Sequence, residues 1–268
     1  NANITHPDMV RDIHRDYILA GAEIIITNTF STSRATLAND GLSEQTEEIN
    51  KQSVSLAMDA RKMCDVEETV AIAGSMSAFE PKGHPEIIPS YEEALEDYRE
   101  QVGILSGAGV DLIVLEMFTR TVDLKAAIDA ATETRLPIWV GLSCESHDGQ
   151  IYLGLMGRHG GETISDAVTA SLSPNVKAIC IMHSSPQVTA DALRELKEHT
   201  SLSIGAYAHG GCLDGGGQSN AGTNPEKYLD YAREWVTCGA TIIGGCCGTT
   251  PEHIGVLRVN NLRDTNVK

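Results

Sequence analysis

The sequence predicts an α/β protein whose best candidate architecture is a (β/α)₈ barrel of the TIM type. Short apolar runs alternate with longer helical segments along the whole chain, which is the pattern of strands and helices in such folds. The apolar runs are continuous rather than alternating, as in parallel strands that are buried on both faces. The length of 268 residues also suits one barrel. An open, doubly wound parallel sheet is the alternative architecture.

The predicted strands are rich in aliphatic residues and stop at glycine or polar residues. They cover residues 22–27, 70–73, 111–116, 137–142, 176–182, 202–207 and 240–243. This set is one strand short of a barrel of eight, and the chain begins in the helix that should follow the first strand. We therefore expect the first strand to be missing from this sequence, and a preceding segment or a second copy of the chain to cover the open seam.

The predicted helices occupy the segments between these strands. They cover residues 6–20, 43–64, 91–108, 123–134, 163–172, 189–199 and 225–238. In the first helix, Met9, Ile13, Tyr17 and Ile18 share one apolar side. A last helix should start at Pro251, because proline suits the first helical position. No linker or low-complexity segment interrupts residues 1–268, so we expect a single domain.

Composition narrows the classes of partner. Lys and Arg number 20 against 37 Asp and Glu, which gives a formal net charge of −17. A surface this acidic repels nucleic-acid phosphates and anionic lipid, and no apolar run approaches the roughly 18 residues of a membrane span. Seven scattered cysteines do not resemble a disulfide framework. We therefore expect a cytoplasmic protein that binds neither nucleic acid nor membrane.

Polar and sulfur-containing side chains recur where the predicted strands stop. They are Asn28, Thr29, Ser75, Glu116, Ser143, Cys144, His183, Tyr207, His209, Cys246 and Cys247. Each has a structural explanation as well: Asn28 could cap a turn, and Glu116 could pair with Arg120. Because TIM barrels carry their sites at the C-terminal ends of the strands, their recurrence predicts a site there. The loop 78–89 adds His84 and Glu86, which are also of metal-binding type.

The stretch GGCCGTTPEHI, residues 244–254, is the most specific motif of the chain. Its adjacent cysteines end an apolar run, and the flanking glycines permit the strand to stop or twist, so that both sulfurs can serve one site. By generic rules a vicinal pair is weak evidence for a metal, and two small buried apolar residues are the other interpretation. The whole string resembles the C-terminal signature of the zinc-dependent homocysteine S-methyltransferases. That family includes the betaine, S-methylmethionine and cobalamin-dependent methionine synthase homocysteine modules.

The resemblance implies a barrel in which Cys246 and Cys247 supply two of three zinc ligands. Further segments that resemble the family are Thr27–Phe30, Gly74-Ser75, Leu115-Glu116-Met117 and Tyr207–Gly211. In the family the glutamate binds the amino group of homocysteine. The resemblance therefore implies that Asn28, Thr29, Gly74, Ser75, Glu116 and Tyr207 bind the substrate.

The third ligand departs from the family pattern. The family has Asn-Cys-(Thr/Ser)-Ser-Pro after a strand, whereas this chain has Met-His-Ser-Ser-Pro at residues 182–186. The alignment puts His183 at the position of the cysteine, and imidazole is a good zinc ligand. We therefore predict a zinc site of His183, Cys246 and Cys247. Cys144 is an alternative ligand, while an acid–base role of His183 and loss of the metal site are the other interpretations.

The function that follows is zinc-dependent methyl transfer to a thiol. The donor would be small and of the onium type, such as a betaine or a methylsulfonium, and the acceptor would be homocysteine, giving methionine. His209 stands where the family has asparagine, and together with His183 it suggests an altered substrate or donor. A zinc lyase or hydrolase that uses His183 and His209, or a non-catalytic ligand-binding relative, are the alternatives. We expect a homo-oligomer.

Overall fold

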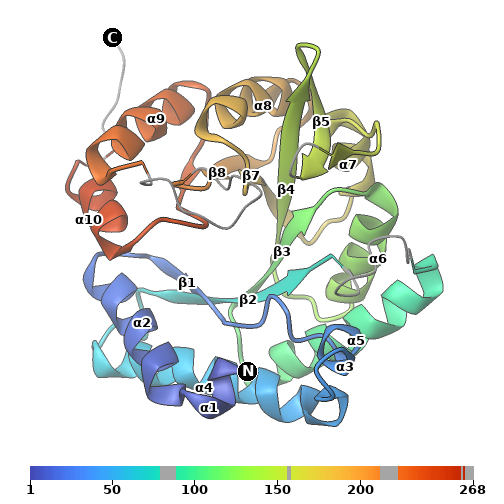
Figure 1. The fold of residues 1–268 in the computed structure, drawn as a ribbon, viewed down its shortest axis with the longest axis vertical. Helices are drawn as coiled ribbons and strands as arrows, with labels where there is room; N and C mark the ends of the chain where they lie inside the picture. The colour runs from blue at the N-terminus through green and yellow to red at the C-terminus, as the bar shows by residue number, and fades with distance from the viewer. Residues whose placement is uncertain (79–88, 156–157, 212–222, 261, 263–268) are drawn as a thin grey trace. The chain divides into compact units, whose positions relative to one another are not determined.

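The computed structural model describes residues 1–78, 89–155, 158–211, 223–260 and 262 (Figure 1). Its main strands are β1 Ile24–Ile26, β2 Ala71–Ser77, β3 Leu112–Phe118, β4 Ile138–His147, β7 Val176–Met182, β8 Ser203–Tyr207 and β9 Ile242–Ile243. Hydrogen bonding orders them β1-β2-β3-β4-β7-β8-β9. The order follows the chain without a reversal, whereas a doubly wound sheet reverses at a switch point. The alternative architecture is therefore wrong.

The strands pair in parallel, as their continuous apolar runs predict. β1 is parallel to β2, β2 to β3, β7 to β8 and β8 to β9. β1 and β9 stand at the two ends of the order. The chain divides into two compact units: residues 1–116, 122–139 and 173–176 form the first, and residues 117–121, 140–172 and 177–268 form the second.

The first unit places helices beside β1, β2 and the beginning of β3. Its helices are α1 Ala2–Thr5, α2 Pro7–Leu19, α3 Arg34–Ala38, the 3₁₀ turn Ser43–Gln45, α4 Thr46–Met63, α5 Tyr91–Ala108 and α6 Thr121–Thr132, which begins one residue before the unit resumes. α2 and α4 lie side by side (Figure 1). On the strands, Ala73, Leu112 and Val114 form a buried cluster with Ile24 and Trp139 packed against it. Burial of this apolar face drives the sheet together.

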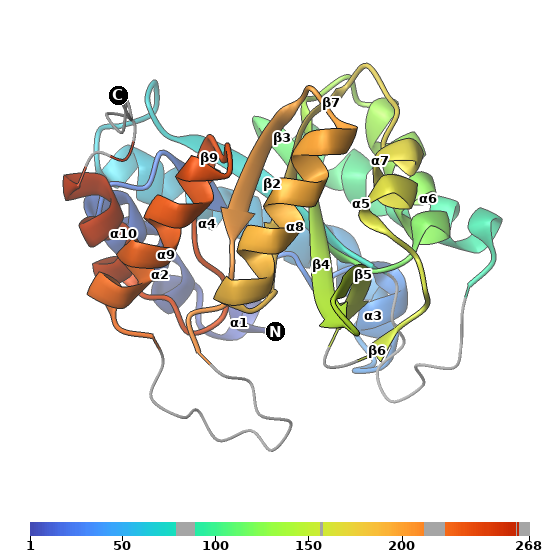
Figure 2. The same ribbon diagram turned by 90° about the horizontal axis from the view of Figure 1, so that it is seen from above.

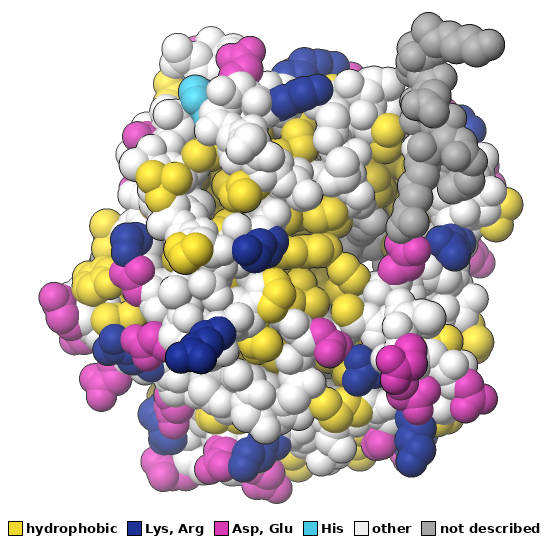
Figure 3. Space-filling model, turned by 180° about the vertical axis from the view of Figure 1, so that it is seen from behind, with side chains coloured by type: hydrophobic (Ala, Val, Ile, Leu, Met, Phe, Trp, Pro, Cys, Tyr) yellow, Lys and Arg dark blue, Asp and Glu magenta, His cyan; other side chains and the backbone are white. Residues whose placement is uncertain are grey.

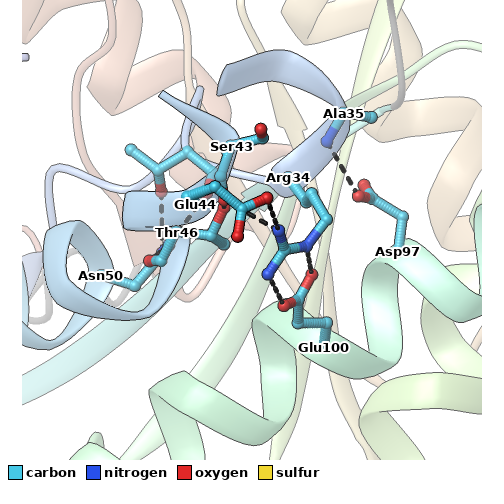
Figure 4. Close-up of polar contacts among 9 residues, drawn as sticks. Arg34, Ala35, Ser43, Glu44, Thr46, Asn50, Asp97 and Glu100 are labelled. Carbon is cyan, nitrogen blue, oxygen red and sulfur yellow. Dashed lines mark hydrogen bonds and ion pairs between the residues drawn. The ribbon is translucent and has the colours of Figure 1, made fainter. Parts of the chain in front are cut away.

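The segment 29–42, which we predict to be a loop, contains α3. The Ser33 side chain caps this helix by accepting from the Thr36 amide. Arg34 donates to both carboxylate oxygens of Glu100 on α5, at 2.8 and 2.6 Å, and the Ala35 amide donates to Asp97 at 3.1 Å (Figure 4). The prediction was wrong because a helix of this length has no periodicity to detect, and contacts with α5 hold it in place.

The second unit contains α7 Ile164–Ala170, α8 Pro186–His199, α9 Pro225–Thr237 and α10 Pro251–Val259. α8 contacts α9, and α9 contacts α10 (Figure 1). α8 starts at Pro186, three residues before the predicted start, because the Ser185 side chain caps it by accepting from the Val188 amide. α10 starts at Pro251, as predicted.

A β-hairpin in the second unit is missing from the sequence prediction. β4 continues to His147 and pairs antiparallel with β5 (Gln150–Leu155), which in turn pairs with β6 (Arg158–His159) (Figure 2). Asp148 and Gly149 form the two-residue turn, with φ of 51° and 79°, as a type I′ turn requires. The Asp-Gly pair was the sequence signal for this hairpin.

Charged side chains of both signs are interspersed on the face shown in Figure 3. Ion pairs such as Arg11–Asp8 at 2.8 Å and Arg99–Glu133 at 2.6 Å join neighbouring charges of opposite sign. Exposed pairs of this kind contribute little to stability.

None of the helices in the described ranges combines the length and apolar character that a bilayer crossing needs.

Candidate metal centre and acceptor site

Three side chains of metal-binding type meet at the ends of β7 and β9 in the second unit. His183 Nδ1 lies 3.5 Å from Cys246 Sγ and 3.6 Å from Cys247 Sγ, and the two sulfurs are 3.8 Å apart. Among the described residues, these three form the group of His, Cys, Asp or Glu whose donor atoms lie within 4.8 Å of one another. The structure thus brings together the residues predicted as the zinc site, although 63 positions separate His183 from Cys246.

The spacing of these donors suits a tetrahedral ion. Bond lengths of about 2.3 Å to sulfur and about 2.0–2.1 Å to nitrogen give tetrahedral edges of about 3.8 Å between sulfurs and about 3.5 Å between sulfur and nitrogen. The observed edges are 3.8, 3.5 and 3.6 Å. Two thiols and an imidazole are also the soft and borderline donors that zinc prefers. The residues present therefore fit zinc, with one tetrahedral position left for a further ligand.

His183 reaches the cysteines through an unusual backbone conformation. Its φ is 47°, in the left-handed region that costs a residue with a Cβ about 1 kcal/mol or more. The conformation ends β7, and the segment after it is fixed by Ser184. That hydroxyl donates to the Met182 carbonyl at 2.9 Å and accepts from the Cys144 amide at 2.8 Å. A strained backbone conformation persists only where the surrounding structure enforces it, and such conformations are most common at functional sites.

The cysteine pair lies in a turn directly after β9. The Cys246 amide donates to the Ala208 carbonyl at 3.0 Å, so parallel pairing with the chain after β8 continues to this residue. The Thr249 amide then returns to the Cys246 carbonyl at 3.2 Å. Gly248 has a φ of 79°, and a Cβ on Gly210 would lie 2.9 Å from Thr249 Cγ2 and 3.2 Å from the Gly248 backbone, so the two turns pack closely. The pairing therefore ends at Cys246, the chain turns at the pair, and both sulfurs lie near the same imidazole.

Tyr228 on α9 braces the two strand ends that flank this turn. Its hydroxyl lies 2.9 Å from the carbonyl oxygens of both Ala208 and Gly244, and the side chain is fully buried. The ring packs edge-on against Trp235 and His253. Sequence reasoning missed this residue, since a tyrosine inside an amphipathic helix gives no signal beyond core packing.

Electrostatics distinguish the thiols of the second unit. The hydrogen bond from Cys246, followed by that with His183, lowers the pKa of Cys247 to about 4. Burial instead raises the pKa of Cys144, which opposes formation of a metal-binding thiolate. Cys144 is buried and lies outside the donor group described above. The geometry favours His183 over Cys144 as the third ligand.

His209 lies beside the donor group without belonging to it. Its ring packs edge-on against His183, with centroids 5.9 Å apart. Burial, followed by the nearby His183, lowers the pKa of His209.

The other two predicted residues of metal-binding type, His84 and Glu86, lie outside the described residues.

Glu116, the predicted ligand of the acceptor's amino group, ends the part of β3 that belongs to the first unit. It is 7% exposed, and Ser75 on β2 donates to its carboxylate at 2.5 Å. Ser75 and Thr29 are both completely buried, and the Thr29 hydroxyl donates to the Ser75 carbonyl at 2.7 Å. The structure thus joins three of the predicted substrate residues by hydrogen bonds within the first unit.

The other predicted substrate residues have separate surroundings. The Asn28 side chain is exposed and donates to Asn3 on α1 at 2.9 Å. Gly74 packs closely against its neighbours, since an added Cβ would meet Val110, Ile113 and Leu105 at 3.2–3.3 Å. Tyr207 ends β8 in the second unit and belongs to a buried cluster against which Cys246 packs. Their roles in substrate binding stay predictions.

Comparison with known proteins decides the family. The sequence model described as homocysteine S-methyltransferase matches residues 1–260. The chain belongs to the homocysteine S-methyltransferase family. It is 28% identical over 274 residues to homocysteine S-methyltransferase 3 of Zea mays, covering 94% of this chain and 79% of the relative. Selenocysteine methyltransferase of Astragalus bisulcatus is 26% identical over 287 residues, covering 94% of this chain and 82% of that protein.

A solved structure of this family supports the fold. The metallated form of the homocysteine methyltransferase MmuM from Escherichia coli matches with a TM-score of 0.80 and 27% identity, covering 97% of this chain and 86% of that chain. Together with the parallel strand order, the match confirms the predicted α/β fold of the TIM-barrel class. The prediction of an S-methyltransferase of the homocysteine S-methyltransferase family is confirmed as well.

Proposed function

We propose that this enzyme transfers a methyl group from a small onium-type donor to the thiol of homocysteine, giving methionine, with zinc held by His183, Cys246 and Cys247. The observation that carries the proposal is the donor triangle of 3.5, 3.6 and 3.8 Å in a chain of this family. Bound there, zinc would supply a position for the incoming thiol and lower its pKa, so that the acceptor reacts as a thiolate.

The chain's own residues prepare the centre for this chemistry. The lowered pKa of Cys247 favours the ionised form of that sulfur, and the left-handed backbone of His183 directs Nδ1 at both sulfurs. Because ligand thiols must be reduced to bind metal, we also propose the cytoplasm as the compartment.

Glu116 would bind the amino group of the acceptor, since an ammonium group donates strong, charge-assisted hydrogen bonds to a carboxylate. Asn28, Thr29, Gly74, Ser75 and Tyr207 would contribute to the acceptor site directly or through their neighbours. The chemistry is transfer to a soft nucleophile, so orientation of the acceptor matters more than proton transfer. No arrangement among the described residues favours a lyase, a hydrolase or a non-catalytic role over methyl transfer.

Product formation from defined donors tests the proposal. Purified enzyme is incubated with homocysteine and either S-methylmethionine or glycine betaine, and methionine is measured. We expect methionine with at least one donor, loss of activity after treatment with a chelator, and recovery with zinc. Donor breakdown without homocysteine would instead indicate a lyase or hydrolase. Zinc binding without methyl transfer from either donor would indicate a non-catalytic relative.

A further inference from the structure

The buried hydroxyl groups beside Glu116 form a directed chain of hydrogen bonds in the first unit. Thr29 Oγ1 donates to the Ser75 carbonyl at 2.7 Å, so its single proton is committed. Thr27 Oγ1 lies 2.7 Å from Thr29 Oγ1 and accepts from the Ser75 amide at 3.2 Å, so Thr27 is the donor to Thr29. The Ser75 hydroxyl donates to Glu116. Each of these hydroxyl protons is therefore used within the protein.

Two helices, α4 and α5, hold the residues at the start of this series of hydrogen bonds. Gln101 on α5 donates through Nε2 to the Thr29 carbonyl at 2.9 Å and reaches Thr32 Oγ1 at 3.3 Å. Thr32 donates to Asn50 Oδ1 on α4 at 2.7 Å, and Asn50 donates back to the Thr32 carbonyl at 2.8 Å. Gln101 is 1% exposed and Asn50 is completely buried. Rigid helices therefore fix the segment that follows β1.

Burial separates these residues from direct contact with a substrate. Thr29 and Ser75 are completely buried, and Thr27 is 3% exposed. The last group in this series of hydrogen bonds is the Glu116 carboxylate, which accepts from Ser75. A carboxylate that accepts a hydrogen bond from a fixed hydroxyl is limited to a narrow range of orientations. This series of hydrogen bonds is thus arranged to orient one group, the Glu116 carboxylate, for recognition of a ligand.

We propose that Thr29 and Gln101 are positioning residues for acceptor recognition. They fix Ser75, whose hydroxyl sets the orientation of the Glu116 carboxylate toward the amino group of the acceptor. The inference rests on the proposed function, in which Glu116 binds that amino group. It assigns a role to α5, a helix that carries none of the residues predicted from the sequence.

The test compares two acceptors that differ in the amino group alone. Homocysteine and 4-sulfanylbutanoate share the thiol and the carboxylate, so the ratio of their kcat/KM values measures recognition of the amino group. Thr29→Val removes the hydroxyl at nearly constant volume, and Gln101→Leu removes the anchor on α5. Thr29→Ser keeps the hydroxyl. Ser53→Ala removes a buried hydroxyl from α4 that has no hydrogen-bond partner among the described residues, and it is the control.

We expect Thr29→Val and Gln101→Leu to reduce the preference for homocysteine roughly tenfold, through KM rather than kcat. Thr29→Ser and Ser53→Ala should keep it. A merely structural role would lower the melting temperature and leave the preference unchanged, so thermal unfolding is measured for each variant. If either Thr29→Val or Gln101→Leu fails to fold, the other carries the test.

Glu116→Gln separates the two levels of the argument. If it abolishes the preference while Thr29→Val and Gln101→Leu fold and keep the wild-type preference, the positioning role is wrong and the role of Glu116 stands. If Glu116→Gln itself keeps the wild-type preference, the proposed role of Glu116 and the positioning role are both overturned.

Discussion

At the scale of single residues, the proposed zinc ligands lie in backbone that other side chains hold in place. The Tyr228 hydroxyl lies between the carbonyls of Ala208 and Gly244, which flank the cysteine turn. Loss of a group that holds the ligands of a metal typically lowers metal affinity about 10–100-fold. We therefore expect Tyr228 to support the proposed metal centre through the backbone that carries the two cysteines.

Tyr228→Phe should lower zinc affinity about tenfold, because it leaves a buried carbonyl without its hydroxyl partner and loosens the turn that carries both cysteines. Competition with a chromophoric chelator measures the affinity. Tyr231→Phe is the matched control, since Tyr231 lies on the same helix and accepts from Gln187 rather than contacting the turn. Equal zinc affinities in the two variants would contradict this role for Tyr228.

Sequence reasoning at this scale succeeded where a motif spans several residues. The string 244–254 and the Ser185-Pro186 alignment selected the three donors that the structure brings together. It could not find Tyr228 or Gln101, because their importance depends on which carbonyls they meet after folding. The direction of the hydrogen bonds of Thr29 and Ser75 could not be predicted either. The sequence shows which residues follow the strands, but it does not show which groups donate a proton.

At the scale of elements, α3 is held on α5 by contacts between charged groups. Arg34 is paired with Glu100, and Asp97 accepts from the Ala35 amide, while the second carboxylate oxygen of Asp97 is buried without a partner among the described residues (Figure 4). Burial raises the pKa of Asp97, with a further contribution from Glu100, although the Ala35 amide, Ser33 and Arg34 oppose the shift. The folded chain therefore binds the proton of Asp97 more tightly than the unfolded chain does.

This shift predicts how stability responds to pH. A carboxyl group with a raised folded pKa stabilises the fold below its unfolded pKa, near 3.9, and that contribution is lost as pH rises through the folded pKa. Asp97→Asn does not titrate. Its melting temperature relative to wild type should therefore increase between about pH 4 and pH 7, measured on metal-free protein. A constant difference across this range would contradict the raised pKa.

The elements show why some local structure escaped prediction. The long helices and continuous apolar strands were recognised because their patterns extend over many residues, as at Tyr91–Ala108 and Val176–Met182. α3 is short and depends on Arg34, and β4 continues beyond the point where its apolar run stops in order to pair with β5. The Asp148-Gly149 pair was a signal for the hairpin, but the sequence prediction did not use it.

At the scale of the whole molecule, metal binding should raise the free energy of unfolding and the melting temperature. Zinc that binds the folded chain alone stabilises it by about 2.7 kcal/mol at a concentration of roughly 100 times its Kd, which corresponds to roughly 5–10 °C in melting temperature for a chain of this size. Differential scanning fluorimetry with and without zinc measures the change. The variant Cys246→Ala/Cys247→Ala should show no such increase. Equal responses of wild type and this variant would place the stabilising metal elsewhere.

The organisation of residues 1–268 as one domain and the homo-oligomeric state stay predictions. Both were inferred from the pattern of strands and from the expectation that an open edge of the barrel must be covered. Light scattering coupled to size-exclusion chromatography measures the assembly directly.

Zinc content of His183 variants tests the central claim most directly. Wild type should bind about one zinc ion per chain, measured by mass spectrometry of the metal after dialysis. Cys246→Ala and Cys247→Ala should lose it, and His183→Ala should bind it far more weakly, because two donors remain in each case. His183→Cys restores the sulfur of the family pattern and should retain zinc. Full zinc occupancy with unchanged affinity in His183→Ala would show that His183 is not a ligand, and would move the third position to Cys144.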